Sequence, residues 1–309
     1  MKIAIIDLGT NTSNLLIAEH SEDSYNIIFR GKQLVRMGDT QIKDNLISNE
    51  AIDRVLSVLK DQKKIIESNG VDKVKIIATS GVRSAKNQED FIRAVKQSTG
   101  YPVEVISGEK EADLIFKGVL LALNNLIEKS LILDIGGGSN ELIIAHNQHI
   151  IWKESKPAGM ARITNQFVLS DPLKPGEIEI LQNYFSARHQ DAFNNLKKEA
   201  VNTLIGCSGS FDTIADILDQ VDPGIKVRTW QEIPLPDFYK VYELLIRSTR
   251  AQRINMKGMD SVRVDLIVPA MIFIDLIIKK SGIIHIIQTG NSLREGVLHE
   301  LMNNKPEVI

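Results

Sequence analysis

Asp7 and Asp134 stand where a carboxylate could take part in phosphate chemistry. Each ends a run of apolar residues and lies two positions before a glycine, Gly9 in one case and Gly136 in the other. Backbone N–H groups of a glycine-rich turn can bind phosphate oxygens, and a neighbouring carboxylate can hold Mg²⁺ directly or through water. The pattern therefore predicts two phosphate-binding turns with metal-binding carboxylates. The alternative for each is an ordinary tight turn.

The segments around the two aspartates repeat one another. Ala4–Ala18 (AIIDLGTNTSNLLIA) aligns without gaps with Leu131–Ala145 (LILDIGGGSNELIIA), at an offset of 127 residues. Each has the pattern of a β-hairpin, an apolar strand followed by a turn and a second apolar strand. One Asp-x-Gly alone would favour an ordinary turn, whereas the duplication and the three consecutive glycines favour phosphate binding. The predicted phosphate contacts in the turns are Gly9, Thr10, Asn11, Gly136, Gly137, Gly138 and Ser139.

A second pair of segments repeats at nearly the same offset. Val74–Val82 (VKIIATSGV) resembles Thr203–Phe211 (TLIGCSGSF), and each is an apolar strand that ends in Ser-Gly before a helix. Two pairs in the same order predict a duplicated domain. Arg83 follows the first Ser-Gly and could neutralise phosphate charge; a solvated arginine at a helix start is the alternative.

Two glutamates at the start of a predicted helix are candidates for the base that activates water. Glu109 and Glu111 are two residues apart, so their side chains point in directions that differ by about 200°. Apolar residues continue from Glu111 along one helix face, at Ile115, Val119 and Ala122. This spacing favours Glu111 as the inward-facing base and Glu109 as an exposed acid that complements the helix dipole. A structural first-turn acid is the alternative for either residue.

Glu141 lies just past the second turn, on the returning strand. A side chain there could approach a metal ion held by Asp134, and an ordinary strand residue is the alternative.

The rest of the chain alternates between helical and extended patterns, which predicts an α/β fold. The repeat places a domain boundary near Asn125, giving domains 1–125 and 126–309, with the last helix able to pack back on the first domain. A cleft between the halves is the expected ligand site. The predicted helices are Ala51–Asn69, Glu109–Leu126, Gly176–Ala200, Ser210–Leu218, Phe238–Gln252, Val262–Lys280 and Leu293–Met302, and the further strands are Val103–Ile106 and Ile283–Gln288.

Composition excludes several other classes of protein. The chain has 309 residues, a formal net charge of −2 and a single cysteine, Cys207. The charge balance gives no sign of nucleic-acid binding, and Cys207, in an apolar strand, is predicted to be a core residue. The six histidines lack metal-ligand spacing, and neither a Walker motif nor a GxSxG motif occurs. Without a signal peptide or a long apolar span, we expect a cytoplasmic protein that does not bind membranes.

Several motifs resemble those of a known family when taken together and in order. They are IDLGTNTSNLLIA, ATSGVRSAKN, VISGEKEADLIFKGV, LDIGGGSNELI, PAGMARIT, GCSGSFDTIA, Arg263-x-Asp265 and SLREGVL. The chain resembles the exopolyphosphatase and guanosine pentaphosphate phosphatase family, of the actin, sugar-kinase and heat-shock-chaperone ATPase superfamily. The resemblance covers the whole chain and implies the short type with two duplicated actin-like (ribonuclease H-like) domains.

The resemblance also implies roles for individual residues. Glu111 is implied as the catalytic base, Arg83 as a phosphate contact, and Asp7, Asp134 and Glu141 as the groups that organise Mg²⁺, with Mn²⁺ as an alternative; Asp134 and Glu141 count as catalytic. Lys110, Asn140 and Ala270 depart from the family pattern without removing a catalytic group.

The leading hypothesis is a Mg²⁺-dependent phosphoanhydride hydrolase that releases terminal phosphate from inorganic polyphosphate, guanosine pentaphosphate (pppGpp) or both. Two alternatives stay open, a small-molecule kinase of the same superfamily and a non-catalytic regulator that binds an alarmone or nucleotide. The substrate is the expected partner, and a homodimer is left open.

Overall fold

The computed structural model describes residues 1–21, 24–39 and 45–303. The chain divides into two compact units, Met1–Gly118 with Leu293–Ile309 and Val119–Ser292. It leaves the first unit within helix α4 (Gly108–Leu123) and returns to it with helix α12 (Leu293–Asn303). Among the described residues, no helix is long and apolar enough to span a membrane.

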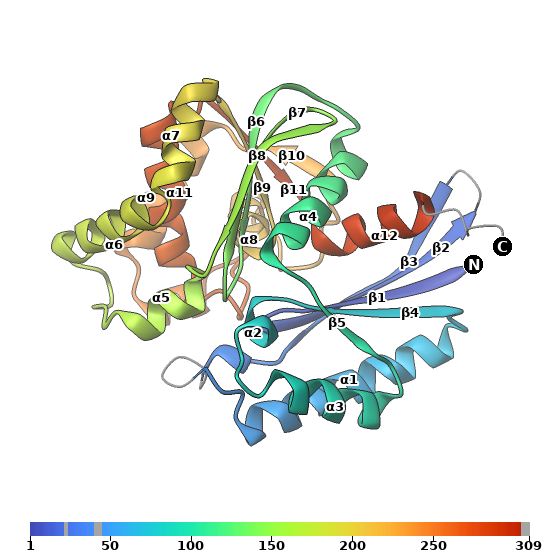
Figure 1. The fold of residues 1–309 in the computed structure, drawn as a ribbon. Coiled ribbons are helices and arrows are strands. Elements are labelled where there is room, and N and C mark those ends of the chain that lie inside the picture. The colour runs from blue at the N-terminus through green and yellow to red at the C-terminus, as the bar shows by residue number, and fades with distance from the viewer. Residues whose placement is uncertain (22–23, 40–44, 304–309) are drawn as a thin grey trace. The chain divides into compact units, whose positions relative to one another are not determined.

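The first unit is built on a five-stranded sheet in the order β3-β2-β1-β4-β5 (Figure 1). β1, β2 and β3 are antiparallel neighbours, and β4 and β5 continue the sheet parallel to β1. The strand bounds are β1 Lys2–Leu8, β2 Thr12–Ser21, β3 Ser24–Leu34, β4 Lys73–Ala78 and β5 Val103–Val105.

Helices α1 (Asn49–Ser68) and α3 (Gln88–Thr99) pack on one face of this sheet, and α12 contacts β1 and β2 (Figure 1). Buried residues recur along α1 at helical spacing, as at Val55 and Leu59, so that an apolar stripe faces the sheet. Two short helices complete the unit, the 3₁₀ helix η1 (Met37–Asp39) and α2 (Ser80–Arg83).

The second unit has a six-stranded sheet in the order β10-β11-β9-β6-β7-β8. β6, β9 and β11 are parallel, whereas β7, β8 and β10 run antiparallel to their neighbours. The strand bounds are β6 Leu126–Ile135, β7 Asn140–Asn147, β8 His149–Lys156, β9 Thr203–Cys207, β10 Trp230–Glu232 and β11 His285–Thr289.

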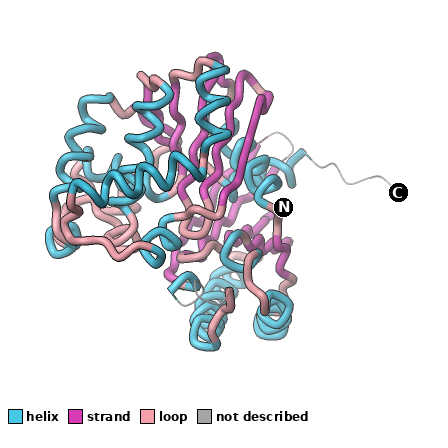
Figure 2. Tube along the Cα trace, turned by 60° about the vertical axis from the view of Figure 1, so that its left-hand side comes forward, coloured by secondary structure: helices cyan, strands magenta, loops and turns pink. Residues whose placement is uncertain are grey.

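Helices lie beside this sheet (Figure 2), and α11 (Ile267–Ser281) is labelled among α6, α7 and α9 in Figure 1. It packs against α5, α6, α7 and α9, and its residues from Ile267 to Ile278 are all buried. All of these residues except Asp275 are apolar, as expected for a helix that is surrounded by protein. The other helices are α5 Met160–Gln166, α6 Pro175–Arg188, α7 Gln190–Glu199, α8 Gly209–Asp219, α9 Leu235–Arg247 and α10 Arg250–Ile254.

The two units share one strand plan. In both sheets three antiparallel strands are followed by two strands parallel to the first of them, and the second sheet adds the antiparallel strand β10 at its edge. The registers match as well, since Asp7 lies opposite Asn14 in the first hairpin and Asp134 lies opposite Glu141 in the second. The two predicted hairpins and the α/β class are therefore confirmed.

Four predicted helices were wrong in extent. The segment 176–200 forms two helices, because His189 leaves the helical region and its buried ring bonds to Glu154 instead. Segment 238–252 is likewise divided, since Ser248 is extended. Helix α11 begins only at Ile267 after a series of turns, and α4 ends at Leu123. The strands β3, β8 and β10 and the helix α5 were not predicted.

Candidate active site

The first predicted phosphate-binding turn is a compact loop between β1 and β2. The Gly9 amide donates a hydrogen bond to the Thr12 carbonyl oxygen at 2.9 Å, which closes the loop. The carbonyl oxygens at the tip accept hydrogen bonds from the segment after β3: Asn11 from Val35 at 2.9 Å, and Thr10 from Met37 at 2.8 Å. The carbonyl side of this turn is thus held by the protein.

The second turn repeats this arrangement between β6 and β7. The Gly136 amide donates to the Ser139 carbonyl oxygen at 3.0 Å, at the position equivalent to Gly9 and Thr12. The tip carbonyls are again covered, Gly137 by the Ala161 amide at 2.9 Å and Gly138 by the Arg162 Nε at 2.8 Å.

Since the carbonyls of both turns are occupied, the tip amides are the groups left for a ligand. Within the described residues, the amides of Thr10, Asn11, Gly137 and Gly138 donate no hydrogen bond to a protein group. Consecutive N–H groups of this kind form a concave anion-binding site. The predicted phosphate-binding residues therefore lie in two turns of the same geometry. Their contact with phosphate stays a prediction.

Asp134 and Glu141 lie opposite each other in the second hairpin. Directly opposed residues of antiparallel strands project from the same face of the sheet, so these carboxylates are neighbours. Asp134 is 7% exposed, and its Oδ2 accepts hydrogen bonds from Ser208 Oγ at 2.7 Å and Ser292 Oγ at 2.6 Å. Glu141 is buried and accepts from Ser155 Oγ at 2.7 Å.

Asp7 has a different neighbour in the equivalent position of the first hairpin. It is half-buried, and its Oδ2 accepts a hydrogen bond from Asn14 Nδ2 at 3.0 Å. The residue opposite Asp7 is thus an amide, whereas the residue opposite Asp134 is a second carboxylate.

The structure brings Glu111 and Arg83 together in the first unit. Arg83 Nη1 donates to Glu111 Oε2 at 2.9 Å and to the Ile106 carbonyl oxygen at 2.9 Å. Glu111 is 7% exposed and Glu109 is exposed, so the predicted orientation of the two side chains is confirmed. Two residues before Arg83, Gly81 lies against the first turn, and a Cβ there would approach Thr10 Oγ1 to 3.0 Å. The base candidate, the arginine and the first turn are therefore linked through α2.

Sequence reasoning gave no role to Ser208, Ser292 or Arg263, which surround Asp134 or lie near it. The Arg263 guanidinium is buried against Gly209, where a Cβ would lie 2.6 Å from Nε. Burial lowers the pKa of Arg263, while Asp260, Asp134 and Asp212 act in the opposite direction. The motifs GCSGSFDTIA and Arg263-x-Asp265 were the available signals, but neither indicates which side chain reaches Asp134.

Cys207 is buried beside this group, as predicted for a core residue. Burial, followed by the charge of Asp134, raises the pKa of its thiol well above the usual range.

The oxygen donors around Asp134 fit a hard cation such as Mg²⁺. Within the part of the chain that the structure describes, no group of three or more His, Cys, Asp or Glu side chains could hold a metal ion. Mg²⁺ needs only one or two carboxylates when water and substrate phosphates supply its other ligands, and Asp134 and Glu141 meet that requirement. Asp7 belongs to the first unit, so its predicted share in the metal site stays a prediction.

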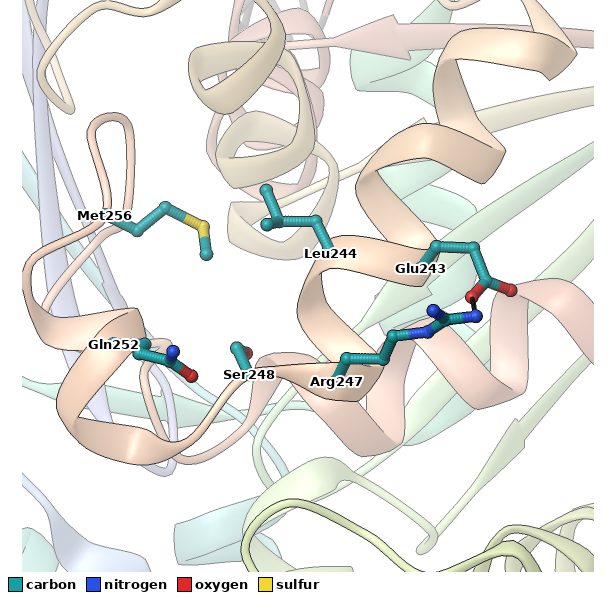
Figure 3. A pocket seen from close by; sticks show the side chains of 6 residues that line it. All are labelled: Glu243, Leu244, Arg247, Ser248, Gln252 and Met256. Atoms are coloured by element: carbon teal, nitrogen blue, oxygen red, sulfur yellow. Dashed lines mark ion pairs between the residues drawn. The ribbon is translucent and has the colours of Figure 1, made fainter.

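A separate pocket of about 600 Å³ lies beside the end of α9 and helix α10 (Figure 3). Its lining residues are Glu243, Leu244, Arg247, Ser248, Gln252 and Met256. Glu243 and Arg247 form an ion pair at its edge, at 2.8 Å. None of the predicted phosphate or metal ligands lines this pocket.

Comparison with known proteins agrees with this arrangement. Residues 16–305 match the Ppx/GppA phosphatase family. An exopolyphosphatase structure from Cytophaga hutchinsonii is similar over 98% of both chains, with a TM-score of 0.94 and 35% identity. Exopolyphosphatase 2 of Mycobacterium tuberculosis is 26% identical over 86% of each chain. A bifunctional 3-dehydroquinate synthase/phosphatase of Fusobacterium nucleatum is 32% identical over 98% of this chain, which spans only 47% of that relative's length.

The two sheets and their matching hairpins define an actin-like fold, and the predicted fold class is confirmed. The chain belongs to the Ppx/GppA phosphatase family.

Proposed function

We propose that this protein is a phosphoanhydride hydrolase that removes the terminal phosphate from inorganic polyphosphate. The observation that carries the proposal is the pair of matching turns, each with its carbonyls held by the protein and two tip amides available. Each turn offers its amides to an anionic group, and polyphosphate is a chain of such groups.

Glu111 supplies the base in this proposal. Its carboxylate accepts a proton from water as the water oxygen attacks the terminal phosphorus. The bridging P–O bond breaks, and the shortened chain leaves with the bridging oxygen. The ion pair with Arg83 holds the Glu111 carboxylate in place beside the first turn.

Arg83 has further N–H donors that could bind the substrate. Its Nη1 bonds to Glu111 and Ile106, whereas Nε and Nη2 donate to no protein group in the described ranges of the chain. A guanidinium with two donors on one edge can bind phosphate oxygens in a bidentate manner. Arg83 can therefore orient the base and bind the phosphate at the same time.

Mg²⁺, when bound at Asp134 and Glu141, would neutralise charge on the phosphate oxygens. The buried hairpin carboxylates provide this binding site, and the hydroxyls of Ser155, Ser208 and Ser292 fix their orientation. Mn²⁺ prefers the same oxygen ligands and is the expected substitute.

The name exopolyphosphatase, which two similar proteins carry, supports polyphosphate as the substrate. Guanosine pentaphosphate is the second candidate, because it presents the same terminal phosphoanhydride. The test is the release of inorganic phosphate from polyphosphate, guanosine pentaphosphate and ATP, measured in parallel with Mg²⁺ present. We expect release from at least one of the first two, faster than from ATP.

Metal removal tests the role of Asp134 and Glu141. EDTA should abolish phosphate release, and added Mg²⁺ or Mn²⁺ should restore it. Undiminished turnover after rigorous chelation would contradict the metal-carboxylate proposal. Phosphate transfer from ATP to a small molecule, without release, would instead indicate a kinase, and binding without turnover would indicate a regulator.

A further inference from the structure

The environment of Asp134 contains an unusual backbone conformation. Ser208, which precedes helix α8, has φ 68° and ψ 176°. Residues other than glycine rarely adopt this region, and they keep it only where the surrounding structure enforces it. Such strained residues are common at functional sites, so the conformation of Ser208 indicates a functional role.

The neighbours of Ser208 explain how it is held. Its carbonyl oxygen accepts hydrogen bonds from the amides of Phe211 at 3.1 Å and Asp212 at 3.2 Å, which fixes it to the start of α8. The next residue, Gly209, is in contact with the buried guanidinium of Arg263. The strained backbone is therefore built into the packing of this unit.

The backbone conformation of Ser208 places its hydroxyl within hydrogen-bond distance of Asp134. β9 pairs with β6 so that Cys207 lies opposite Asp134, and Ser208 is the first residue beyond β9. Ser292 follows β11, the next parallel strand, and its Oγ reaches the same carboxylate oxygen, Oδ2. The ends of three parallel strands thus converge on one carboxylate.

Both hydroxyls bond to Oδ2, which leaves the other oxygen available. In the part of the chain that is described, Asp134 Oδ1 accepts no hydrogen bond from the protein. We propose that Ser208 and Ser292 are positioning residues that fix Asp134 so that Oδ1 is presented to the metal ion. This inference rests on the proposed function, because it presupposes that Asp134 binds the metal ion of that function.

Substitution of either serine should weaken metal binding. Changes in residues that orient a metal ligand typically cost 10–100-fold in metal affinity. We expect Ser208→Ala and Ser292→Ala each to raise the half-activating Mg²⁺ concentration about 10–100-fold. Near-normal kcat should return at saturating Mg²⁺, and Ser292→Thr, which keeps a hydroxyl, should behave like the wild type.

Mn²⁺ binding gives a measurement that does not depend on turnover. Titration followed by the electron paramagnetic resonance signal of free Mn²⁺ should show the same 10–100-fold weakening in both alanine variants.

A matched pair of variants distinguishes the effect of the Ser208 hydroxyl from the effect of its backbone conformation. Ser208→Gly and Ser208→Ala both remove the hydroxyl, but only glycine adopts the local φ and ψ without strain. The glycine variant should therefore unfold about 2–4 °C above the alanine variant, yet both should show the same weakened Mn²⁺ binding. Ala200→Gly, at a positive φ of 53° after α7, is the control for strain relief alone.

The outcomes distinguish this inference from the function on which it rests. If the wild type binds Mn²⁺ and releases phosphate, but Ser208→Gly and Ser292→Ala keep its metal affinity, the positioning role is wrong. A Ser208→Gly enzyme with wild-type affinity beside a weakened Ser208→Ala enzyme would assign Ser208 a backbone role only. A wild type that neither binds Mn²⁺ nor releases phosphate would overturn both proposals.

Discussion

The two hairpin turns have the same backbone but different side chains around them. Each turn is closed by one hydrogen bond between equivalent residues, and each has its tip carbonyls covered by the segment after the third strand. The covering groups differ, since the first turn uses only backbone amides and the second adds the side chain of Arg162. The backbone feature that could bind phosphate is thus duplicated.

The side chains that could perform chemistry are not duplicated. Counted from the Ser-Gly after the fourth strand of each half, Arg83 in the first unit corresponds to Phe211 in the second, which is a core residue. Asn14 likewise corresponds to Glu141. One backbone arrangement therefore occurs twice, while the proposed base and its arginine lie in the first unit and the paired carboxylates lie in the second.

The largest expected effect tests the chemistry assigned to the first half. Glu111→Gln keeps the size of the side chain and its contact with Arg83 but cannot accept a proton, so kcat should fall by about 10²–10⁴-fold. Steady-state phosphate release from polyphosphate measures this effect, with folding checked by circular dichroism.

Glu109→Gln is the matched control, two residues away on the exposed face of the same helix. Its kcat should stay close to that of the wild type. A Glu111→Gln enzyme with normal turnover beside an inactive Glu109→Gln enzyme would reverse the assignment.

The next effect compares the two aspartates directly. Asp134→Asn removes a charge from the paired carboxylates, and we expect kcat/KM to fall by about 10²–10³-fold. Asp7→Asn affects a half-buried residue whose neighbour is an amide, so a loss of about 10–100-fold is expected. Equal losses, together with equal changes in Mg²⁺ dependence, would show that Asp7 and Asp134 contribute equally to metal binding. This result would contradict the assignment of the metal site to the second unit alone.

The sequence predicted the hairpins well because their repeat has no gap and their strands are buried. It did not predict the outer strands β3 and β8. Along β3, exposed and half-buried residues alternate without a buried face, so the strand lacks the apolar signal on which strand prediction depends. Pairing with β2, rather than local pattern, makes β3 a strand.

The part of the candidate site that consists of local motifs was predictable from the sequence, and the part that depends on distant partners was not. Asp7, Asp134 and the glycine turns are local motifs, whereas the hydrogen bonds of Ser208 and Ser292 to Asp134 span 74 and 158 residues. Such partners depend on strand order, which a motif does not contain. The break at His189 has the same origin, since a buried contact with Glu154 overrides a continuous helical pattern.

The smallest effect tests whether the two turns are equally tolerant of a side chain. A Cβ at Gly136 would lie 2.8 Å from the Ser139 carbonyl oxygen, whereas a Cβ at Gly9 would lie 3.3 Å from the Thr12 carbonyl oxygen. The first distance requires the backbone to move, and the second can be relieved by a shift of a few tenths of an ångström. Gly136→Ala should therefore lower the free energy of unfolding by about 1–3 kcal/mol, and Gly9→Ala by less than about 1 kcal/mol. Differential scanning calorimetry of both variants measures the difference. Equal destabilisation would mean that the turns differ less in packing than their backbone contacts indicate.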